Sequence, residues 1–327
     1  MSELTTAAFA AETGTHLVAE PRSGRYAAFA RRFDAAGYEA ELVRRGLRFL
    51  PRSAPEFPSL LAAIHDPPVG LFLRGSSPLE LLGRPAVAIV GARACSPYGA
   101  QVARDCGREL GAAGLVIVSG LARGVDGHAH RGALEAGGDT VAVLGCGIDR
   151  DYPASHRDLT AQIAGAGLVV SEYALGVEPA PWRFPARNRI IAGLAAVTVV
   201  IEAREASGAL ITADLALEEG REVFAVPGEI TSALSAGTNA LLRLGATPLT
   251  STRDVLESLG IEPPAPIQPR LGDAAQAVLE RLRDAPASAD ALARATHLDA
   301  GAAAAALLEL ELAGLASEAE GVYRGVT

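Results

Sequence analysis

Residues 86–119, AVAIVGARACSPYGAQVARDCGRELGAAGLVIVS, contain the repeating unit that decides the fold. A short run made only of Ala, Val and Ile opens it, and a second apolar run closes it. Nearly continuous apolar runs of this length are typical of strands buried on both faces of a parallel sheet. Pro97 begins a helical pattern between them, as proline often does, because it lacks the N–H that would be unpaired there. The stretch therefore predicts a strand–helix–strand unit.

The same alternation continues along the chain. We predict strands at residues 86–90, 115–119, 140–144, 168–171, 196–202 and 222–227. We predict helices at residues 97–112, 126–135, 155–164, 186–193, 210–219 and 237–244. Repeated strand–helix alternation is the signature of a doubly wound α/β domain with a mainly parallel, Rossmann-like sheet.

The parts on either side of this pattern differ from it. Residues 1–83 form a partly helical N-terminal region, with helix-like stretches at 24–37 and 40–46 and a short strand at 69–74. The Rossmann-like domain covers residues 84–260. A linker at residues 261–270 holds four prolines, which stiffen it and forbid a helix.

Residues 271–327 have the element order of a winged helix. Helices at 273–284, 288–295 and 299–313 precede a possible hairpin at 315–324, bent at Glu320-Gly321. The third helix carries Asp299, Glu309 and Glu311 but no basic residue, although a helix that lies against phosphates is expected to carry one. A protein contact or a packing role is therefore favoured for this module.

Composition places the chain among ordinary globular proteins. No apolar run reaches the ~18 residues of a membrane span, and no basic residue precedes the first apolar stretch as in a signal peptide. The three widely spaced cysteines, Cys95, Cys106 and Cys146, argue against a disulfide framework. We therefore expect a cytoplasmic protein without a membrane segment.

The net charge of −9 opposes nucleic-acid binding at first sight. Net charge governs long-range steering, however, whereas the local charge of a groove determines what the groove holds. All 29 basic residues are arginine, whose planar fork fits phosphate and stacks on bases. The absence of lysine is also what a codon bias would produce.

In an open parallel sheet, ligands bind outside the carboxyl ends of the strands. After the first strand, Gly91 allows close backbone approach and the helix at Pro97 offers free N–H groups to an anion. Arg93 stands where a dinucleotide fingerprint has its second glycine, and no Walker-type lysine exists, so no cofactor is expected. After the second strand, Gly120 and Gly124 flank Arg123, and successive N–H groups there could form an anion-binding nest.

The loop after the fourth strand is rich in arginine and aromatic residues. Arg183, Arg187 and Arg189 alternate with Trp182 and Phe184. Arginine side chains can contact phosphates, and bases can stack on the neighbouring aromatic rings. Alternatively, the two rings pack in the core at the start of a helix.

The sequence argues against two other kinds of site. In the sequence 126–130, Asp126 and His130 share a helix face but His128 does not, so a cap and a packed histidine explain the pattern better than a metal. No Gly-x-Ser-x-Gly elbow of a serine hydrolase occurs.

Taken together, these loops closely resemble the DprA family, also called Smf, of DNA-processing proteins of natural transformation. The matching stretches are VAIVGAR (87–93), VSGLARGVD (118–126) with Ala129-His130, residues 140–153 and 168–173, FPARNRIIAG (184–193), SGALIT (207–212), VFAVPG (223–228) and GTN (237–239). They run from about residue 58 to residue 259, which is most of the chain.

The resemblance implies a homodimer that coats single-stranded DNA, protects it from nucleases and loads the recombinase RecA onto it. It also implies phosphate contacts at Arg93, in the loop 120–124 and in the block 187–189. Family members often carry a lysine where this sequence has Ala154, and Arg157 is the candidate replacement. The predicted DNA-binding residues are Gly91, Arg93, Ser119, Gly120, Arg123, Gly124, Arg157, Arg183, Phe184, Arg187, Asn188 and Arg189.

Besides single-stranded DNA binding, two alternative functions are considered for this sequence. Rossmann-like phosphoribohydrolases carry a Pro-Gly-Gly-x-Gly-Thr-x-x-Glu loop, but here Gly228 is followed by Glu229, and Gly237-Thr238 by Asn239, so the glutamate is not where that chemistry needs it. An interaction scaffold for which DNA is incidental is the third possibility. We expect a protein that is not an enzyme and that uses no metal.

Overall fold

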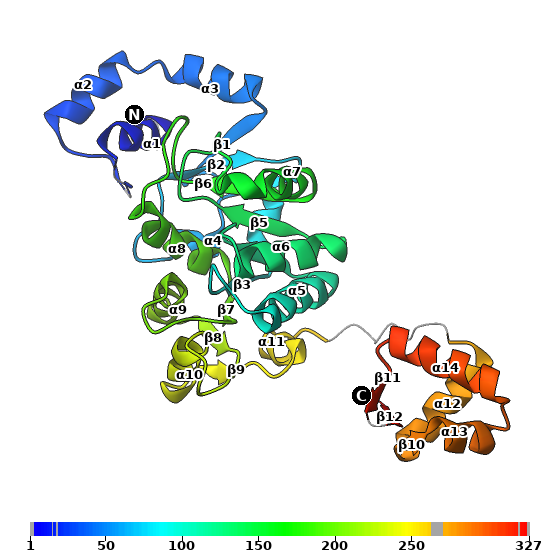
Figure 1. Ribbon diagram of the computed structural model, residues 1–327. Helices are drawn as coiled ribbons and strands as arrows, with labels where there is room; N and C mark the ends of the chain where they lie inside the picture. The colour runs from blue at the N-terminus through cyan, green and yellow to red at the C-terminus, as the bar shows by residue number, and fades with distance from the viewer. Residues whose placement is uncertain (1–2, 15, 18, 263–270, 320, 326–327) are drawn as a thin grey trace. The chain divides into compact units, whose positions relative to one another are not determined.

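The computed structural model describes residues 3–14, 16–17, 19–262, 271–319 and 321–325 (Figure 1). The chain divides into two compact units, Met1–Pro264 and Ala265–Thr327. Most of the expected linker, residues 263–270, lies outside the described residues. Among the described residues, no helix combines the length and the hydrophobicity that a bilayer crossing requires.

A nine-stranded sheet runs through the described part of the first unit, in the order β1-β2-β6-β5-β4-β3-β7-β8-β9. Its strands are β1 Leu47–Pro51, β2 Gly70–Arg74, β3 Ala86–Val90, β4 Val116–Ser119, β5 Thr140–Val143, β6 Leu168–Ser171, β7 Val197–Val200, β8 Glu222–Ala225 and β9 Thr247–Pro248. Strands β3 to β9 pair in parallel. The chain builds outward from β3 through β6 and then returns to β7 on the other side of β3. The strand order therefore reverses between β3 and β7, which is where such sheets bind ligands.

Helices cover both faces of this sheet (Figure 1). They are α4 Ser59–Ala62, α5 Pro97–Ala112, α6 Val125–Glu135, α7 Arg157–Ala166, α8 Arg183–Leu194, α9 Gly208–Glu218, α10 Ala236–Arg243 and α11 Thr252–Ser258, with 3-10 turns at Leu79–Gly83 and Ala154–His156. Alternate residues of β3 point to opposite faces. Val87 and Ile89 pack in one cluster with residues of α5 and α6, whereas Ala88 and Val90 pack in another with residues of α8 and α9. The doubly wound α/β fold predicted from the sequence is confirmed.

The ends of two predicted helices differ from the structure for local reasons. Helix α8 begins at Arg183 instead of residue 186, so that Pro185 lies in its first turn, where proline is tolerated. The helix expected at 155–164 begins as the 3-10 turn Ala154–His156 and continues as α7 to Ala166.

The N-terminal region contains more structure than the sequence indicated. Helix α1, Glu3–Thr13, and strand β1 were not predicted. The helix-like stretch 24–37 is divided into α2, Gly24–Arg32, and α3, Ala35–Arg44, because the side chain of Asp34 accepts from the Gly37 N–H and starts a new helix. Strands β1 and β2 extend the sheet by antiparallel pairing beside β6. The expected boundary between residues 83 and 84 therefore falls inside the first compact unit.

The second unit is a winged helix, as the element order predicted. Its elements are α12 Asp273–Asp284, β10 Ala287–Ser288, α13 Ala289–Thr296, α14 Ala300–Leu312, β11 Ala316–Ala319 and β12 Val322–Gly325. Val278, Leu282 and Leu310 lie in its own buried core. The strands pair in the order β10-β12-β11, and Glu320 in the expected bend lies outside the described residues.

Candidate nucleic-acid interface

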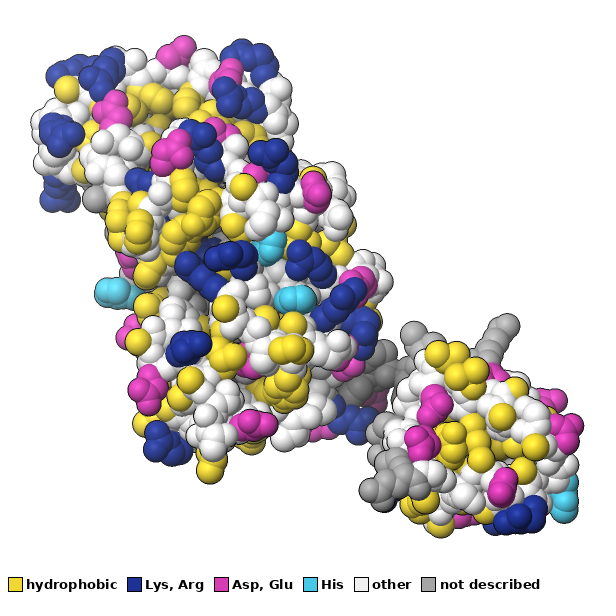
Figure 2. Space-filling model, viewed as in Figure 1, with side chains coloured by type: hydrophobic (Ala, Val, Ile, Leu, Met, Phe, Trp, Pro, Cys, Tyr) yellow, Lys and Arg dark blue, Asp and Glu magenta, His cyan; other side chains and the backbone are white. Residues whose placement is uncertain are grey.

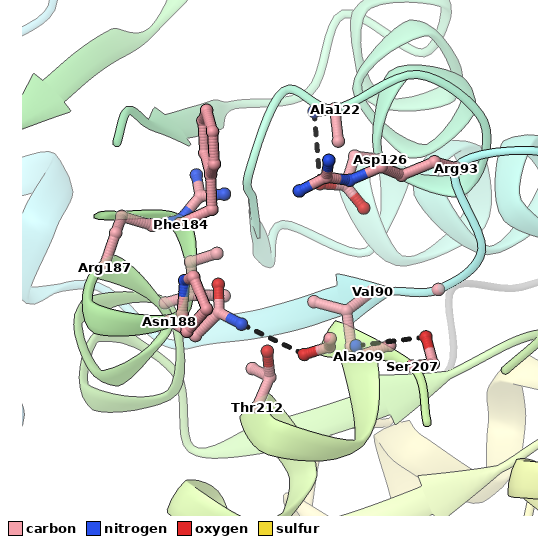
Figure 3. A pocket seen from close by; sticks show the side chains of 14 residues that line it. Val90, Arg93, Ala122, Asp126, Phe184, Arg187, Asn188, Ser207, Ala209 and Thr212 are labelled. Atoms are coloured by element: carbon pink, nitrogen blue, oxygen red, sulfur yellow. Dashed lines mark hydrogen bonds between the residues drawn. The ribbon is translucent and has the colours of Figure 1, made fainter. Parts of the chain in front are cut away.

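A pocket of about 200 Å³ opens at the point where the strand order reverses. The loop after β3 and the first turn of α6 form one wall, and α8 and the start of α9 form the other (Figure 3). A smaller neighbouring pocket of about 60 Å³ shares Arg93, Phe184 and Arg187 with the first and continues along the ends of β4 and β5. The loops that follow three successive strands are thus brought together, as the fold class requires.

Arg93 and Phe184 face each other across this opening. The guanidinium carbon of the exposed Arg93 lies 5.2 Å from the centroid of the half-buried Phe184 ring. Phe184 also stacks on Tyr152, with ring centroids 5.3 Å apart and planes 25° apart. Among the described residues, no carboxylate lies within ion-pair distance of Arg93. The pair therefore presents a charge for a phosphate and a ring surface for a base.

The glycine loop after β4 does not offer the empty anion nest that the sequence predicted. The backbone N–H groups of Gly120 and Ala122 both donate to Oδ2 of Asp126, each over 3.2 Å. Asp126 therefore folds back onto the loop from the first turn of α6 instead of capping the helix. Burial raises the pKa of its carboxyl to about 6, against the lowering influence of Arg187. A carboxyl group already fills the nest.

The shape of that loop still depends on its glycines. Gly124 has φ of +76°, and a Cβ there would lie 2.2 Å from the Ala92 carbonyl oxygen. Leu121 adopts φ of +58°, which is uncommon for a residue with a side chain. Arg123, between them, is exposed, and within the described residues no carboxylate pairs with it. This loop thus contributes an arginine side chain, and two of its N–H groups, those of Gly120 and Ala122, are already occupied.

Ser119 and Gly91 serve packing as well as the site. Ser119 is fully buried and its hydroxyl donates to the Ile89 carbonyl over 2.6 Å, so it joins β4 to β3 and does not reach the surface. Gly91 lines the pocket, and a Cβ on it would lie 2.7 Å from the Val125 side chain. The predicted DNA contact at Ser119 is therefore replaced by a structural role.

Arg187 lies beneath the opening. It is only 4% exposed and its Nη1 donates to the carbonyl oxygens of Gly120, over 2.9 Å, and Val143. Burial lowers the pKa of its guanidinium to about 10, although Asp126 acts in the opposite direction. Arg187 lines both pockets, so it fixes two strand ends and adds positive charge at the floor.

Arg189 differs from the prediction. Its guanidinium makes a two-bonded pair with Glu172, over 2.9 and 2.6 Å, and its Nε lies 3.1 Å from Oδ2 of Asp66. Both Arg189 and Glu172 are buried. The structure therefore gives Arg189 a structural role, in contrast to the expected phosphate contact. Its neighbour Asn188 donates from Nδ2 to the Gly208 carbonyl over 3.0 Å and so joins α8 to the start of α9 (Figure 3).

The remaining predicted arginines, Arg183 and Arg157, are not among the residues that line the two pockets. Arg183 donates to the Glu178 carbonyl and lies over the rings of Trp182 and Tyr173, at 4.8 and 5.4 Å from their centroids. Arg157 is highly exposed and lies 3.4 Å from Asp151 at the nearest approach. That long contact leaves Arg157 able to turn toward a ligand, since an exposed pair of this kind contributes little free energy.

Three residues that line the two pockets, Tyr152, Ser207 and Thr212, were not predicted as site residues. Ser207 caps α9, its hydroxyl accepting from the Ala209 N–H over 3.3 Å. The signal that could have found Ser207 and Thr212 is their position after β7, the strand beside β3 across the reversal point.

The described residues hold no group of three His, Cys, Asp or Glu side chains that could bind a metal ion. His130, at the end of the stretch 126–130, is fully buried, and its Nδ1 lies 2.7 Å from the Thr140 hydroxyl. Burial lowers the pKa of this imidazole to about 3, so it remains neutral.

Two models of known protein families match this chain. The family model described as DNA recombination-mediator protein A matches residues 48–260. The chain belongs to the DprA family. A second model, the DprA winged helix domain, matches residues 262–321.

Individual DprA and Smf proteins are also similar in sequence to this chain. The chain is 49% identical over 200 residues to DNA processing protein DprA of Streptococcus pneumoniae, covering 61% of this chain and 70% of that protein. It is 39% identical over 286 residues to Protein Smf of Escherichia coli K12, covering 84% and 76%.

Solved DprA structures share the fold. The X-ray structure of S. pneumoniae DprA superposes with a TM-score of 0.67 at 38% identity and covers 78% of this chain and 93% of that one. DprA of Helicobacter pylori, whose structure was determined to describe its single-stranded DNA binding mode, gives a TM-score of 0.59 at 33% identity and covers 65% and 95%.

Proposed function

We propose that this DprA-family protein binds single-stranded DNA at the carboxyl ends of β3, β4 and β5. The observation that carries the proposal is the position of Arg93. Its guanidinium is exposed, has no carboxylate partner among the described residues and lies 5.2 Å from the centre of the Phe184 ring. A relative with 33% identity, H. pylori DprA, binds single-stranded DNA according to the description of its structure.

The contacts available favour binding that is largely independent of sequence. Arg93, Arg123 and Arg157 offer guanidinium groups to phosphates, which carry no sequence information. Phe184 and Tyr152 offer rings, on which every base can stack. Duplex DNA should bind more weakly, because its paired bases cannot turn outward onto the rings.

No catalytic step is needed for this function. In the spacing Gly-Thr-x-x-Glu of the phosphoribohydrolase loop, the position of the glutamate is taken here by the buried Leu241. Asn239, in the same turn, joins it to Gly228: its Nδ2 donates to the Gly228 carbonyl over 3.0 Å and its Oδ1 accepts from the Gly228 N–H over 3.3 Å. We infer that the protein binds DNA without hydrolysing nucleotides and without a cofactor.

Two further parts of the proposal concern partners. Large apolar side chains on α9, between α9 and α10 and just after α10 are exposed: Leu217 at 51%, Ile230 at 96% and Leu244 at 85%. We propose that a second copy of the chain covers this surface and forms a homodimer, as the family resemblance implies. We also propose that the protein acts in the cytoplasm and delivers the bound strand to the recombinase RecA, for which the support is its membership of the DprA family.

Fluorescence anisotropy with a labelled homothymidine strand tests the DNA-binding proposal. Arg93→Ala should weaken binding about tenfold, which corresponds to about 1.4 kcal/mol. It should also flatten the salt dependence, because fewer counterions are released. Arg25→Ala, an exposed arginine on α2, is the matched control and should bind like the parent. Equal affinity and salt slope for Arg93→Ala and the parent would contradict the proposed interface.

A further inference from the structure

Helix α6 and the 3-10 turn Ala154–His156 bring together a second group of basic side chains beyond the loop that contains Arg123, in which His156 is buried. An ideal Cβ on Gly127 would lie 2.7 Å from Cε1 and 3.3 Å from Nε2 of His156, and 3.1 Å from Nη1 of Arg131. The His156 ring and the Arg131 guanidinium therefore lie side by side over the bare backbone of Gly127. His128 lies one residue further along the same helix and is half-buried.

The charges that face this group are mostly positive. The charges of Arg131 and Arg123 lower the pKa of His156, and those of Arg131, Arg104 and His156 lower the pKa of His128, in each case after the larger effect of burial. Glu135 is the nearby carboxylate, and Arg104 of α5 holds it through two hydrogen bonds, one of 2.7 Å from Nε. Within the described parts of the chain, neither Arg123 nor Arg131 makes an ion pair.

The hydrogen bonding of His156 determines where it can take up a proton. Its Nδ1 lies 3.1 Å from the carbonyl oxygen of Leu121. A carbonyl oxygen only accepts, so Nδ1 must carry the hydrogen and donate it. Nε2, which has no hydrogen bond to the described residues, is then the atom that gains the second proton. This proton adds charge on the side of the ring next to Arg131.

Arg123 connects this group to the proposed interface. It lines the smaller pocket together with Arg93, Tyr152 and Phe184, and its charge also lowers the pKa of His156. Figure 2 shows arginine and histidine side chains gathered over α6 and the neighbouring loops on one face of the first unit. Positive charge thus continues from the pocket onto the surface of α6.

We propose that Arg131, His128 and His156 form a second phosphate-binding site for single-stranded DNA, which the strand reaches by passing over Arg123. The ligand is a phosphodiester of the same strand that occupies the strand-end pocket. This inference rests on the proposed function and adds to it a direction for the strand and a dependence on pH.

The pH dependence has a definite sign. In the free protein, burial first and the neighbouring arginines second lower the pKa of His156, and the same causes lower the pKa of His128. A bound phosphate favours the charged imidazole and raises both pKa values. Binding therefore takes up protons at a pH between the free and the bound pKa values. Affinity increases as the pH falls through the bound-state values and reaches its full gain below the free-state values.

The test uses the full chain and a labelled homothymidine strand of about 15 nucleotides, a length in the range of known single-strand sites. Anisotropy is measured from about pH 8 to about pH 5.5, the range in which histidine titrates, and at several salt concentrations. Arg131→Gln should lower the slope of log affinity against log salt by about 0.7, the value for one phosphate contact on a single strand. His156→Asn can still donate to Leu121 but cannot take up a proton, so it should flatten the pH dependence.

Arg253→Gln is the matched control. Arg253 is an exposed arginine of α11. The hydroxyl of its neighbour Thr252 donates to Glu109 in the last turn of α5, whereas the proposed interface lies near the first turn of α5, after β3. Arg253→Gln should keep the salt dependence and the pH dependence of the parent's affinity.

The outcomes separate this inference from the proposed function. If Arg93→Ala weakens binding but Arg131→Gln and His156→Asn keep the salt and pH slopes of the parent, the second site is refuted and the first stands. If the parent does not bind the strand, or Arg93→Ala has no effect, both are refuted. Circular dichroism checks folding. If His156→Asn is unfolded, Arg131→Gln and His128→Gln, both at half-buried positions on α6, decide the question by the same slopes.

Discussion

Three arginines of one short segment have three different environments. Arg183 lies over two aromatic rings, Arg187 binds two strand-end carbonyls beneath the pocket, and Arg189 pairs with Glu172. Residues 187 and 189 are two positions apart on a helix and so point in different directions. Composition alone identifies such a segment as basic, but the orientation of the helix decides which side chain reaches a ligand.

The pair of Arg189 and Glu172 leads to a prediction about stability. Arg189→Met should lower the free energy of unfolding by about 3–5 kcal/mol, because it leaves the buried Glu172 carboxylate without its partner. Urea denaturation measures the effect. Arg32→Met, which removes an exposed ion pair with Glu12, should cost less than about 1 kcal/mol. Similar losses for the two variants would argue against a structural role for Arg189.

At the scale of elements, the sequence predicted the α/β alternation well because strands buried on both faces are almost purely apolar. It did not predict β1, Leu47–Pro51, which is an edge strand with half-buried positions and a terminal proline. It also expected an open nest after β4. The nest is filled by Asp126 because the first turn of α6 brings that carboxylate back onto the loop. Such a return depends on the path of the backbone, which local patterns do not specify.

The same loop gives a prediction for Gly124. Gly124→Ala should destabilise the protein by more than about 1 kcal/mol, because φ is positive and the added Cβ would overlap the Ala92 carbonyl. It should also weaken binding of single-stranded DNA, since Arg123 would move with the loop. Thermal melting and anisotropy measure the two effects.

Gly165→Ala provides the matched control for that substitution. Gly165 lies in α7, and a Cβ there meets nothing within 4 Å. This change should be neutral or stabilise by about 0.5–1 kcal/mol, as replacing glycine within a helix usually does. A Gly124→Ala variant that melts and binds like the parent would show that the loop tolerates another conformation.

At the scale of the whole molecule, the two compact units have separate cores, and the winged helix carries acidic residues where a DNA-reading helix would carry basic ones. A chain that ends at residue 264 should therefore keep the affinity of the full chain for single-stranded DNA within about twofold. If the shortened chain lost most of its affinity for single-stranded DNA, DNA binding would instead be assigned to the terminal unit.

The proposed homodimer gives a second prediction at this scale. Leu217→Glu combined with Leu244→Glu should shift the protein from dimer to monomer in sedimentation velocity, because each change places a charge in an apolar contact. A dimer offers one long strand two interfaces, one on each protomer, and this raises the apparent affinity through effective concentration. The monomer should therefore bind long strands more weakly. Arg253→Gln should remain dimeric. A parent protein that sediments as a monomer at all concentrations would contradict the proposed surface.

The central claim is that exposed guanidinium groups at one edge of the sheet hold the phosphates of a single strand despite the net charge of −9. A crystal structure of the protein with a short homothymidine strand tests it most directly. The account predicts phosphate oxygens within hydrogen-bond distance of Arg93 and Arg123, and a base against the Phe184 or Tyr152 ring. A strand bound on another surface, with Arg93 still lying over Phe184 and touching no phosphate, would contradict it.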